Sequence, residues 1–218
     1  MKIVLDCDEV ILESTVAFKA AYLDMVDPTA NIPDRTYSSL WPVWNEKKPS
    51  KEEWGQLLEQ YRNSKWFTAA PPVSGAAEAI RKLKEDGHTL YVLTAIGGND
   101  EPKTLARRKA QLESLVGENI FEDIIHVERF ESKSDKLRDI GAEILVDDSA
   151  GNTTDAIRLG IHGIWFMCPE NAHIYESVMS GNNDTLGNFW KFDAELLRGK
   201  ALVANGWDDV LEIIQKLG

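Results

Sequence analysis

Short apolar runs alternate with helix-like stretches along most of this 218-residue chain. The helix-like stretches have amphipathic spacing, and several of them stop at a glycine just before the next apolar run. Strands and helices that alternate in this way form a parallel sheet with helices on both faces. The pattern therefore predicts an α/β fold with a Rossmann-like parallel sheet.

The expected strands are short and apolar, and several end beside a polar residue; they cover residues 2–5, 88–93, 124–127, 143–146 and 163–167. The expected helices of the sheet domain cover residues 76–86, 104–116, 133–140, 152–159 and 207–217. In such a sheet, ligands bind beyond the carboxyl ends of the strands. Polar residues at those ends are thus the first candidates for a functional site.

Residues 13–69 differ from the rest, because they hold several prolines and tryptophans but no clear parallel strand. Helical spacing covers 14–25 and 51–62, so this part reads as a small helical cap inserted into the sheet domain. The predicted division is a core of residues 1–12 and 70–218 with a cap of residues 13–69. A polar segment at 171–200 is expected to be a long loop or a second small insert.

Composition excludes several classes of partner. The formal charge of −12 argues against a nucleic-acid polymer or an anionic membrane surface. No apolar run approaches the roughly 20 residues that span a bilayer, and the first residues do not resemble a secretory signal. We therefore expect a cytoplasmic protein in which Cys7 and Cys168 are reduced thiols.

Acidic residues follow two of the expected strands. Asp6 and Asp8 come directly after the first strand, and Asp147–Asp148 follow the strand at 143–146. Carboxylates held this close repel one another unless a cation joins them, and Mg²⁺ is the hard cation that oxygen ligands favour. Thr94 ends another strand, and Lys133 stands at a helix start, where the macrodipole disfavours a cation.

Each of these features alone has an ordinary structural explanation. Two aspartates after a strand can be a solvated strand end, and a threonine in that position is usually a turn or cap residue. Lys133 can be a solvated charge, and Lys136 is an alternative for the functional lysine. It is their order along the chain that favours a shared site.

Together and in this order, the motifs resemble the four motifs of the haloacid dehalogenase-like hydrolase superfamily. The resemblance covers about residues 1–12 and 70–168. It implies a Mg²⁺-dependent phosphomonoesterase in which Asp6 attacks phosphorus and Asp8 is the acid and base. Thr94 and Lys133 would then hold the phosphoryl group. Mg²⁺ would be bound at Asp6 and Asp8 and at Asp147–Asp148, with Asp148 touching the metal and Asp147 reaching it through water.

Within that superfamily, the chain is similar to the 5′(3′)-deoxyribonucleotidases, which also place the cap between the first two motifs. Residues 64–67 followed by 71–76 are similar to that family's return from cap to core, and 205–209 to its closing Trp-Asp helix. The implied activity is hydrolysis of phosphoric monoesters, of the 5′-nucleotidase type, on nucleoside monophosphates.

This family resemblance assigns further residues. Trp41 matches an aromatic residue that stacks on the base, and Arg108, or its neighbour Arg107, matches a residue that reaches the phosphate. Ala95 occupies a phosphate-site position where the family has a small polar residue. Glu9 stands where the superfamily often has glycine, and is expected beside the cap entrance.

Three alternatives stay open. The first is a phosphatase of the same superfamily for another small phosphate, such as a sugar phosphate. The second is a two-component receiver domain, in which the order of the acidic motifs differs. The third is a non-catalytic binding protein on the same core. The expected partner is a small phosphate, and the oligomeric state, a homodimer included, is left open.

Overall fold

The computed structural model describes residues 1–32, 50–96, 101–128, 131–181 and 192–218. Within these ranges, six strands form one sheet in the order β3-β2-β1-β4-β5-β6, and all neighbouring strands are parallel. The strands are β1 (Lys2–Leu5), β2 (Thr89–Ala95), β3 (Phe121–Val127), β4 (Ile144–Asp147), β5 (His162–Phe166) and β6 (Leu202–Ala204). The predicted α/β fold with a parallel sheet is confirmed.

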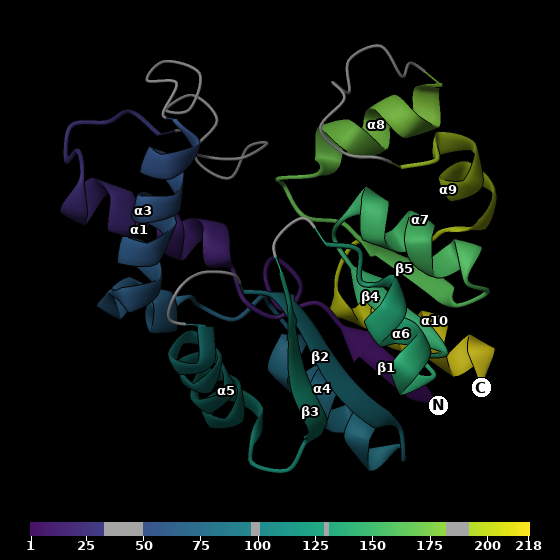
Figure 1. Ribbon diagram of the computed structural model, residues 1–218. Coiled ribbons are helices and arrows are strands. Elements are labelled where there is room, and N and C mark those ends of the chain that lie inside the picture. Colours follow the sequence, from purple (N-terminus) through teal and green to yellow (C-terminus); the bar gives the residue numbers. More distant parts are fainter. Residues whose placement is uncertain (33–49, 97–100, 129–130, 182–191) are drawn as a thin grey trace.

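Helices cover both faces of this sheet. Ile3 and Leu5 of β1 belong to one apolar cluster, and Val4 between them belongs to another, because successive side chains of a strand point to opposite faces. Helices α4 (Ala76–Glu85), α5 (Glu101–Val116) and α10 (Trp207–Leu217) contribute to the first cluster, whereas α6 (Ser134–Ile140) and α7 (Ala150–Arg158) contribute to the second. Figure 1 shows α6 and α7 in front of the sheet and α4 and α10 behind it.

The described part of residues 13–69 contains α1 (Ser14–Met25), α3 (Lys51–Asn63) and the 3-10 helix η1 (Lys65–Ala69). These three elements pack on one another, to one side of the sheet in Figure 1. Their contact centres on aromatic rings, with Phe18 and Phe67 lying 4.8 and 5.6 Å from Tyr61 between centroids. Trp41 and Trp44 lie outside the described residues.

The segment from β5 to β6 corrects one expectation. Of the two alternatives expected for residues 171–200, a long loop is wrong for the described part, which forms helices α8 (Ala172–Ser180) and α9 (Ala194–Lys200). A second small insert stays a prediction. Val178 and Leu197 from these helices are buried in a cluster with Trp165 of β5. This burial stabilises the two helices, which the polar sequence alone does not predict.

The order of the strands fixes where a ligand can bind. From β1 the chain adds β2 and β3 toward one edge of the sheet, and from β4 it adds β5 and β6 toward the other edge. The neighbours β1 and β4 therefore form the switch point of the sheet. Receiver domains have the order 2-1-3-4-5, which the observed order excludes. In the described part of the chain, no helix has both the length and the apolar character to cross a membrane.

Candidate active site

Three carboxylates meet at the carboxyl ends of β1 and β4. The Asp6 amide donates to the Val146 carbonyl at 2.9 Å, which carries the sheet register up to the site. Ligand atoms of Asp6, Asp147 and Asp148 all lie within 4.8 Å of one another. Asp6 and Asp147 are buried. We call these three residues the acidic cluster.

Lys133, the residue before α6, is buried against this cluster. Its Nζ atom lies 2.5 Å from Oδ1 of Asp6 and 2.8 Å from Oδ2 of Asp147. Burial disfavours the charged amine, but the carboxylates of Asp147 and Asp6 outweigh this and raise the pKa of Lys133. Lys136 is exposed. The structure thus brings Lys133, and not Lys136, to the acidic cluster.

The two adjacent aspartates have different partners. Both Asp147 oxygens accept from Asn152 Nδ2 at 3.1 Å, and Oδ1 also accepts from the Ser149 amide at 2.8 Å. The Asp148 carbonyl accepts instead from Trp165 Nε1 and Asn171 Nδ2, at 2.9 and 2.8 Å. Asp148 is therefore fixed through its main chain, which leaves its carboxylate better placed than that of Asp147 to bind a cation directly.

Sequence reasoning missed Asn152 and Asn171. Asn152 lies on the first turn of the helix after the acidic pair, so its position relative to Asp147 was a usable signal. Asn171 gave no such signal, because it reaches Asp148 from 23 residues away.

The acidic cluster has the properties of a divalent-cation site. Burial raises the pKa of Asp6 to about 7, with the nearby Asp147 and Asp8 adding to the rise and Lys133 opposing it. Burial, followed by the Asp147 and Asp6 charges, also raises the pKa of Asp148 well above its usual range. A divalent cation would favour the ionised carboxylates, and a set of hard oxygen donors fits Mg²⁺.

Thr94 lies near the carboxyl end of β2, the neighbour of β1. Its side chain is fully buried, and its Oγ1 atom has no hydrogen-bond partner among the described residues. A buried hydroxyl without a partner costs free energy, so this one is available to a ligand oxygen. Ala95, the next residue, is exposed.

The Asp8 carboxyl is not part of the acidic cluster. Its Oδ1 atom lies 3.2 Å from Nη2 of Arg108, and it also accepts a short hydrogen bond from Ser14. Arg108 is 1% exposed. Arg107 turns to the helical segment instead, donating to the carbonyls of Arg62 and Ser64. Metal binding by Asp8 and phosphate binding by Arg108 stay predictions, and Trp41 lies outside the described residues.

Glu9 occupies the left-handed backbone region, with φ of 63°, which is where glycine is favoured. Its side chain is buried, and Oε1 accepts from the Thr15 amide at 2.6 Å. Burial, with the Glu170 carboxylate as the second cause, raises the pKa of Glu9 to about 7.

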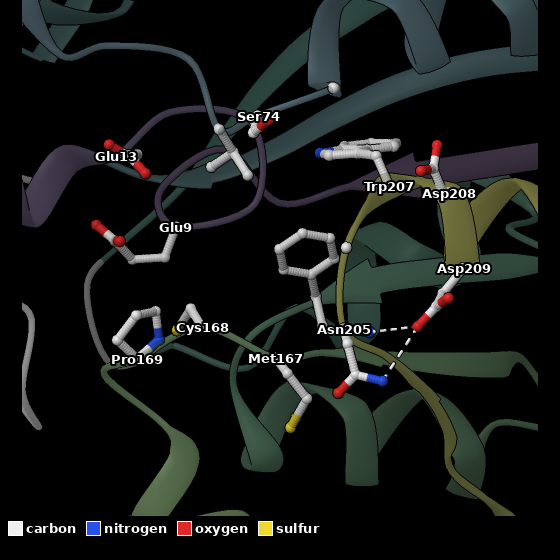
Figure 2. Close-up of a pocket in the computed structure, with 14 residues that line it drawn as sticks. Glu9, Glu13, Ser74, Met167, Cys168, Pro169, Asn205, Trp207, Asp208 and Asp209 are labelled. Carbon is white, nitrogen blue, oxygen red and sulfur yellow. Dashed lines mark hydrogen bonds between the residues drawn. The ribbon is translucent and has the colours of Figure 1, made fainter.

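A pocket of about 480 Å³, drawn in Figure 2, has Glu9 and Cys168 among its lining residues. Glu9 and Glu13 lie on one side of the pocket, and Asp208 and Asp209 lie on another side. The Sγ atom of Cys168, which also lines the pocket, is 3.9 Å from Oδ2 of Asp148. Four carboxyl groups disfavour a phosphate dianion in this pocket.

Solved structures share this fold over nearly their whole length. A haloacid dehalogenase-like hydrolase from Streptococcus pneumoniae is 15% identical, covers 98% of this chain and 97% of its own, and has a TM-score of 0.62. A predicted phosphoglycolate phosphatase from Haemophilus somnus is 12% identical, covers 98% and 97%, and has a TM-score of 0.58. A protein from Bacillus subtilis, described as a HAD-hydrolase and bound to magnesium, is 16% identical, covers 98% of each chain, and has a TM-score of 0.57.

At these identities the likeness establishes the fold of the haloacid dehalogenase-like hydrolases. Neither the family models nor the curated proteins give a match.

Proposed function

We propose that the chain is a Mg²⁺-dependent phosphomonoesterase that forms an aspartyl-phosphate on Asp6. The observation that carries the proposal is the meeting of Lys133 with Asp6 and Asp147 at the switch point, where Asp148 completes the acidic cluster. The hydrolase fold of the solved neighbours supports it.

Lys133 and the acidic cluster could offset the charge repulsion that opposes phosphoryl transfer to a carboxylate. A carboxylate nucleophile and a phosphate dianion repel each other unless positive charge lies between them. Lys133 places a buried ammonium against Asp6. On the neighbouring strand, the Thr94 hydroxyl has no hydrogen-bond partner within the described part of the chain. Mg²⁺, when bound at the acidic cluster, would neutralise the negative charge that gathers on the phosphoryl oxygens.

The reaction then takes two displacements. An Asp6 carboxylate oxygen attacks phosphorus, the bond from phosphorus to the ester oxygen breaks, and Asp8 gives a proton to the departing oxygen. Water next attacks the phosphorus of the aspartyl-phosphate while Asp8 takes its proton. Inorganic phosphate leaves, and the Asp6 carboxylate is regenerated.

We propose a small phosphomonoester as the substrate and residues 13–69 as the cap domain of the site. The phosphoglycolate phosphatase among the solved neighbours favours a small organic phosphate. Specificity for a nucleoside monophosphate would depend on stacking of the base on Trp41. Because Trp41 lies outside the described residues, this specificity stays a prediction.

A panel of phosphomonoesters tests this function. Nucleoside monophosphates, sugar phosphates and phosphoglycolate would be incubated with the purified chain, with Mg²⁺ and with a chelator, and released phosphate would be measured. We expect Mg²⁺-dependent turnover of at least one class and none with Asp6→Asn, an isosteric change. Turnover that survives Asp6→Asn would overturn the proposal.

A further inference from the structure

Arg108 is a buried cation on α5, with 1% of its surface exposed. Burying a charge is costly unless partners compensate for the lost water. The Nε atom is buried and has no hydrogen-bond partner among the described residues. Among these residues, Asp8 Oδ1 lies at 3.2 Å from the guanidinium, Gln111 Oε1 lies at 2.7 Å, and the centroid of the Phe67 ring lies 4.1 Å from the guanidinium carbon. The guanidinium therefore has a defined position beside the proposed acid and base.

The two donors that reach the Asp8 carboxyl bind the same atom. Ser14, the first residue of α1, donates to Oδ1, and so does Arg108. Neither Ser14 nor Arg108 contacts Oδ2 in these hydrogen bonds. Two donors on one oxygen fix the orientation of the carboxyl plane and leave the other oxygen available to a leaving group.

Exposure separates the roles of the two residues. The Asp8 side chain is 43% exposed, whereas that of Arg108 is 1% exposed. A substrate can therefore touch Asp8 while Arg108 stays behind it. This geometry favours an action of Arg108 through Asp8 over a direct contact with phosphate.

Helices α3 and η1 help to define where Arg108 lies. Phe67 belongs to η1, and Gln111, which holds the guanidinium, donates its own amide to the Ala70 carbonyl at 3.0 Å. The Tyr61 hydroxyl of α3 is also buried beside Arg108. Asp8 is thus oriented by α5 from one side and by the start of α1 from the other.

We infer that Arg108 is a positioning residue that holds the Asp8 carboxyl with Oδ2 directed to the leaving oxygen of the substrate. The inference rests on the proposed phosphomonoesterase function. Loss of Arg108 then impairs proton donation to the leaving group and leaves phosphate binding intact.

The test compares two substrates that differ in their need for a proton. The leaving group of 2,4-dinitrophenyl phosphate departs without protonation, whereas the alkoxide of an alkyl phosphate from the active class needs it. The quantity compared is kcat/KM, which covers the steps up to departure of the leaving group. Positioned acids contribute about 10²–10⁴-fold, so Arg108→Met should cost roughly 10²-fold or more on the alkyl phosphate and about 3-fold or less on the aryl phosphate.

Arg107→Met is the matched control, because Arg107 is the adjacent arginine and holds the carbonyls of Arg62 and Ser64. Any loss it causes should be the same for both substrates. Arg108→Lys keeps the positive charge in a smaller side chain and should disturb folding less than Arg108→Met does. It should show the same selective loss on the alkyl phosphate, smaller than that of Arg108→Met.

Inhibition by inorganic phosphate separates positioning from phosphate binding. The inhibition constant for phosphate should stay within about 2-fold of the wild-type value in either Arg108 variant, because Arg108 does not contact phosphate in this account. A 10-fold increase in that constant would correspond to about 1.4 kcal/mol of lost binding free energy. Equal losses on both substrates, or weaker inhibition by phosphate, would overturn the inference while wild-type turnover still upheld the proposed function. A wild-type chain that hydrolyses neither substrate would instead refute the function itself.

Discussion

The ammonium of Lys133 lies 2.5 Å from the carboxylate of Asp6, although 127 residues separate them in the chain. Because Lys133 also reaches Asp147, one buried cation joins the loop after β1 to the end of β4. The acidic cluster therefore depends on a positive charge for its stability as well as for any chemistry.

Replacing Lys133 with methionine should make the folded state sensitive to Mg²⁺. Removing one partner of a buried pair leaves uncompensated charge and costs about 3 kcal/mol. Mg²⁺ should recover part of this loss, since it would neutralise the same carboxylates. Urea unfolding of Lys133→Met with and without Mg²⁺ measures both effects.

Lys136→Met is the control, because Lys136 is exposed on α6; it should change the free energy of unfolding by about 0.5 kcal/mol or less. Similar losses for the two lysine variants would show that Lys133 is not the cation that stabilises the acidic cluster.

Glu9 predicts a pH dependence of stability. Its pKa is raised from 4.5 to about 7, chiefly by burial, so the folded chain holds the proton more tightly than the unfolded chain. The stability from this group is complete below about pH 4.5 and is lost as the pH rises through 7. Glu9→Gln keeps an acceptor for the Thr15 amide but cannot ionise. The variant should therefore lose less free energy of unfolding than the wild-type chain as the pH rises, by on the order of 2 kcal/mol.

Urea unfolding of the metal-free chain at pH 5 and pH 8 checks the Glu9 prediction. The wild-type chain should lose more stability between these two values than Glu9→Gln does. Equal losses would mean that Glu9 is already ionised in the folded chain near pH 5.

Gly163 of β5 has no room for a side chain. A Cβ atom there would lie 2.9 Å from Thr153 Cγ2 and 3.0 Å from Ile157 Cγ1 of α7. Gly163→Ala should therefore lower the free energy of unfolding by about 1–3 kcal/mol. Gly199 in α9 has open space around it, and Gly199→Ala should instead raise that free energy by up to about 1 kcal/mol. Thermal unfolding of both variants tests the packing, and a neutral Gly163→Ala would contradict it.

Sequence patterns predicted the central strands well, because their apolar runs are long enough to be recognised locally. They did not reveal β6, where Leu202–Ala204 is only three residues long and is a strand through its pairing with β5. They also missed α8 and α9, although a helix start was readable at Asp193, whose side chain accepts from the Leu196 amide.

For the candidate site, sequence order placed Asp6, Asp147–Asp148 and Thr94 at strand ends that the sheet then brings to one edge. The surroundings of Asp8 were not predictable in the same way. Arg108 reaches it across 100 residues, and the contacts of that guanidinium with Gln111 and with Phe67 of η1 help to determine where it lies. Long-range partners of this kind depend on tertiary structure, which local sequence patterns do not encode.

The central claim is that Asp6 becomes phosphorylated, and trapping the intermediate tests it most directly. The chain would be mixed with Mg²⁺ and a phosphomonoester labelled with phosphorus-32, quenched in acid, and examined for label bound to protein. We predict acid-stable, base-labile label on the wild-type chain and none on Asp6→Asn, with both proteins folded by circular dichroism. A wild-type chain that turns over substrate without retaining label, or label that persists on Asp6→Asn, would contradict the account.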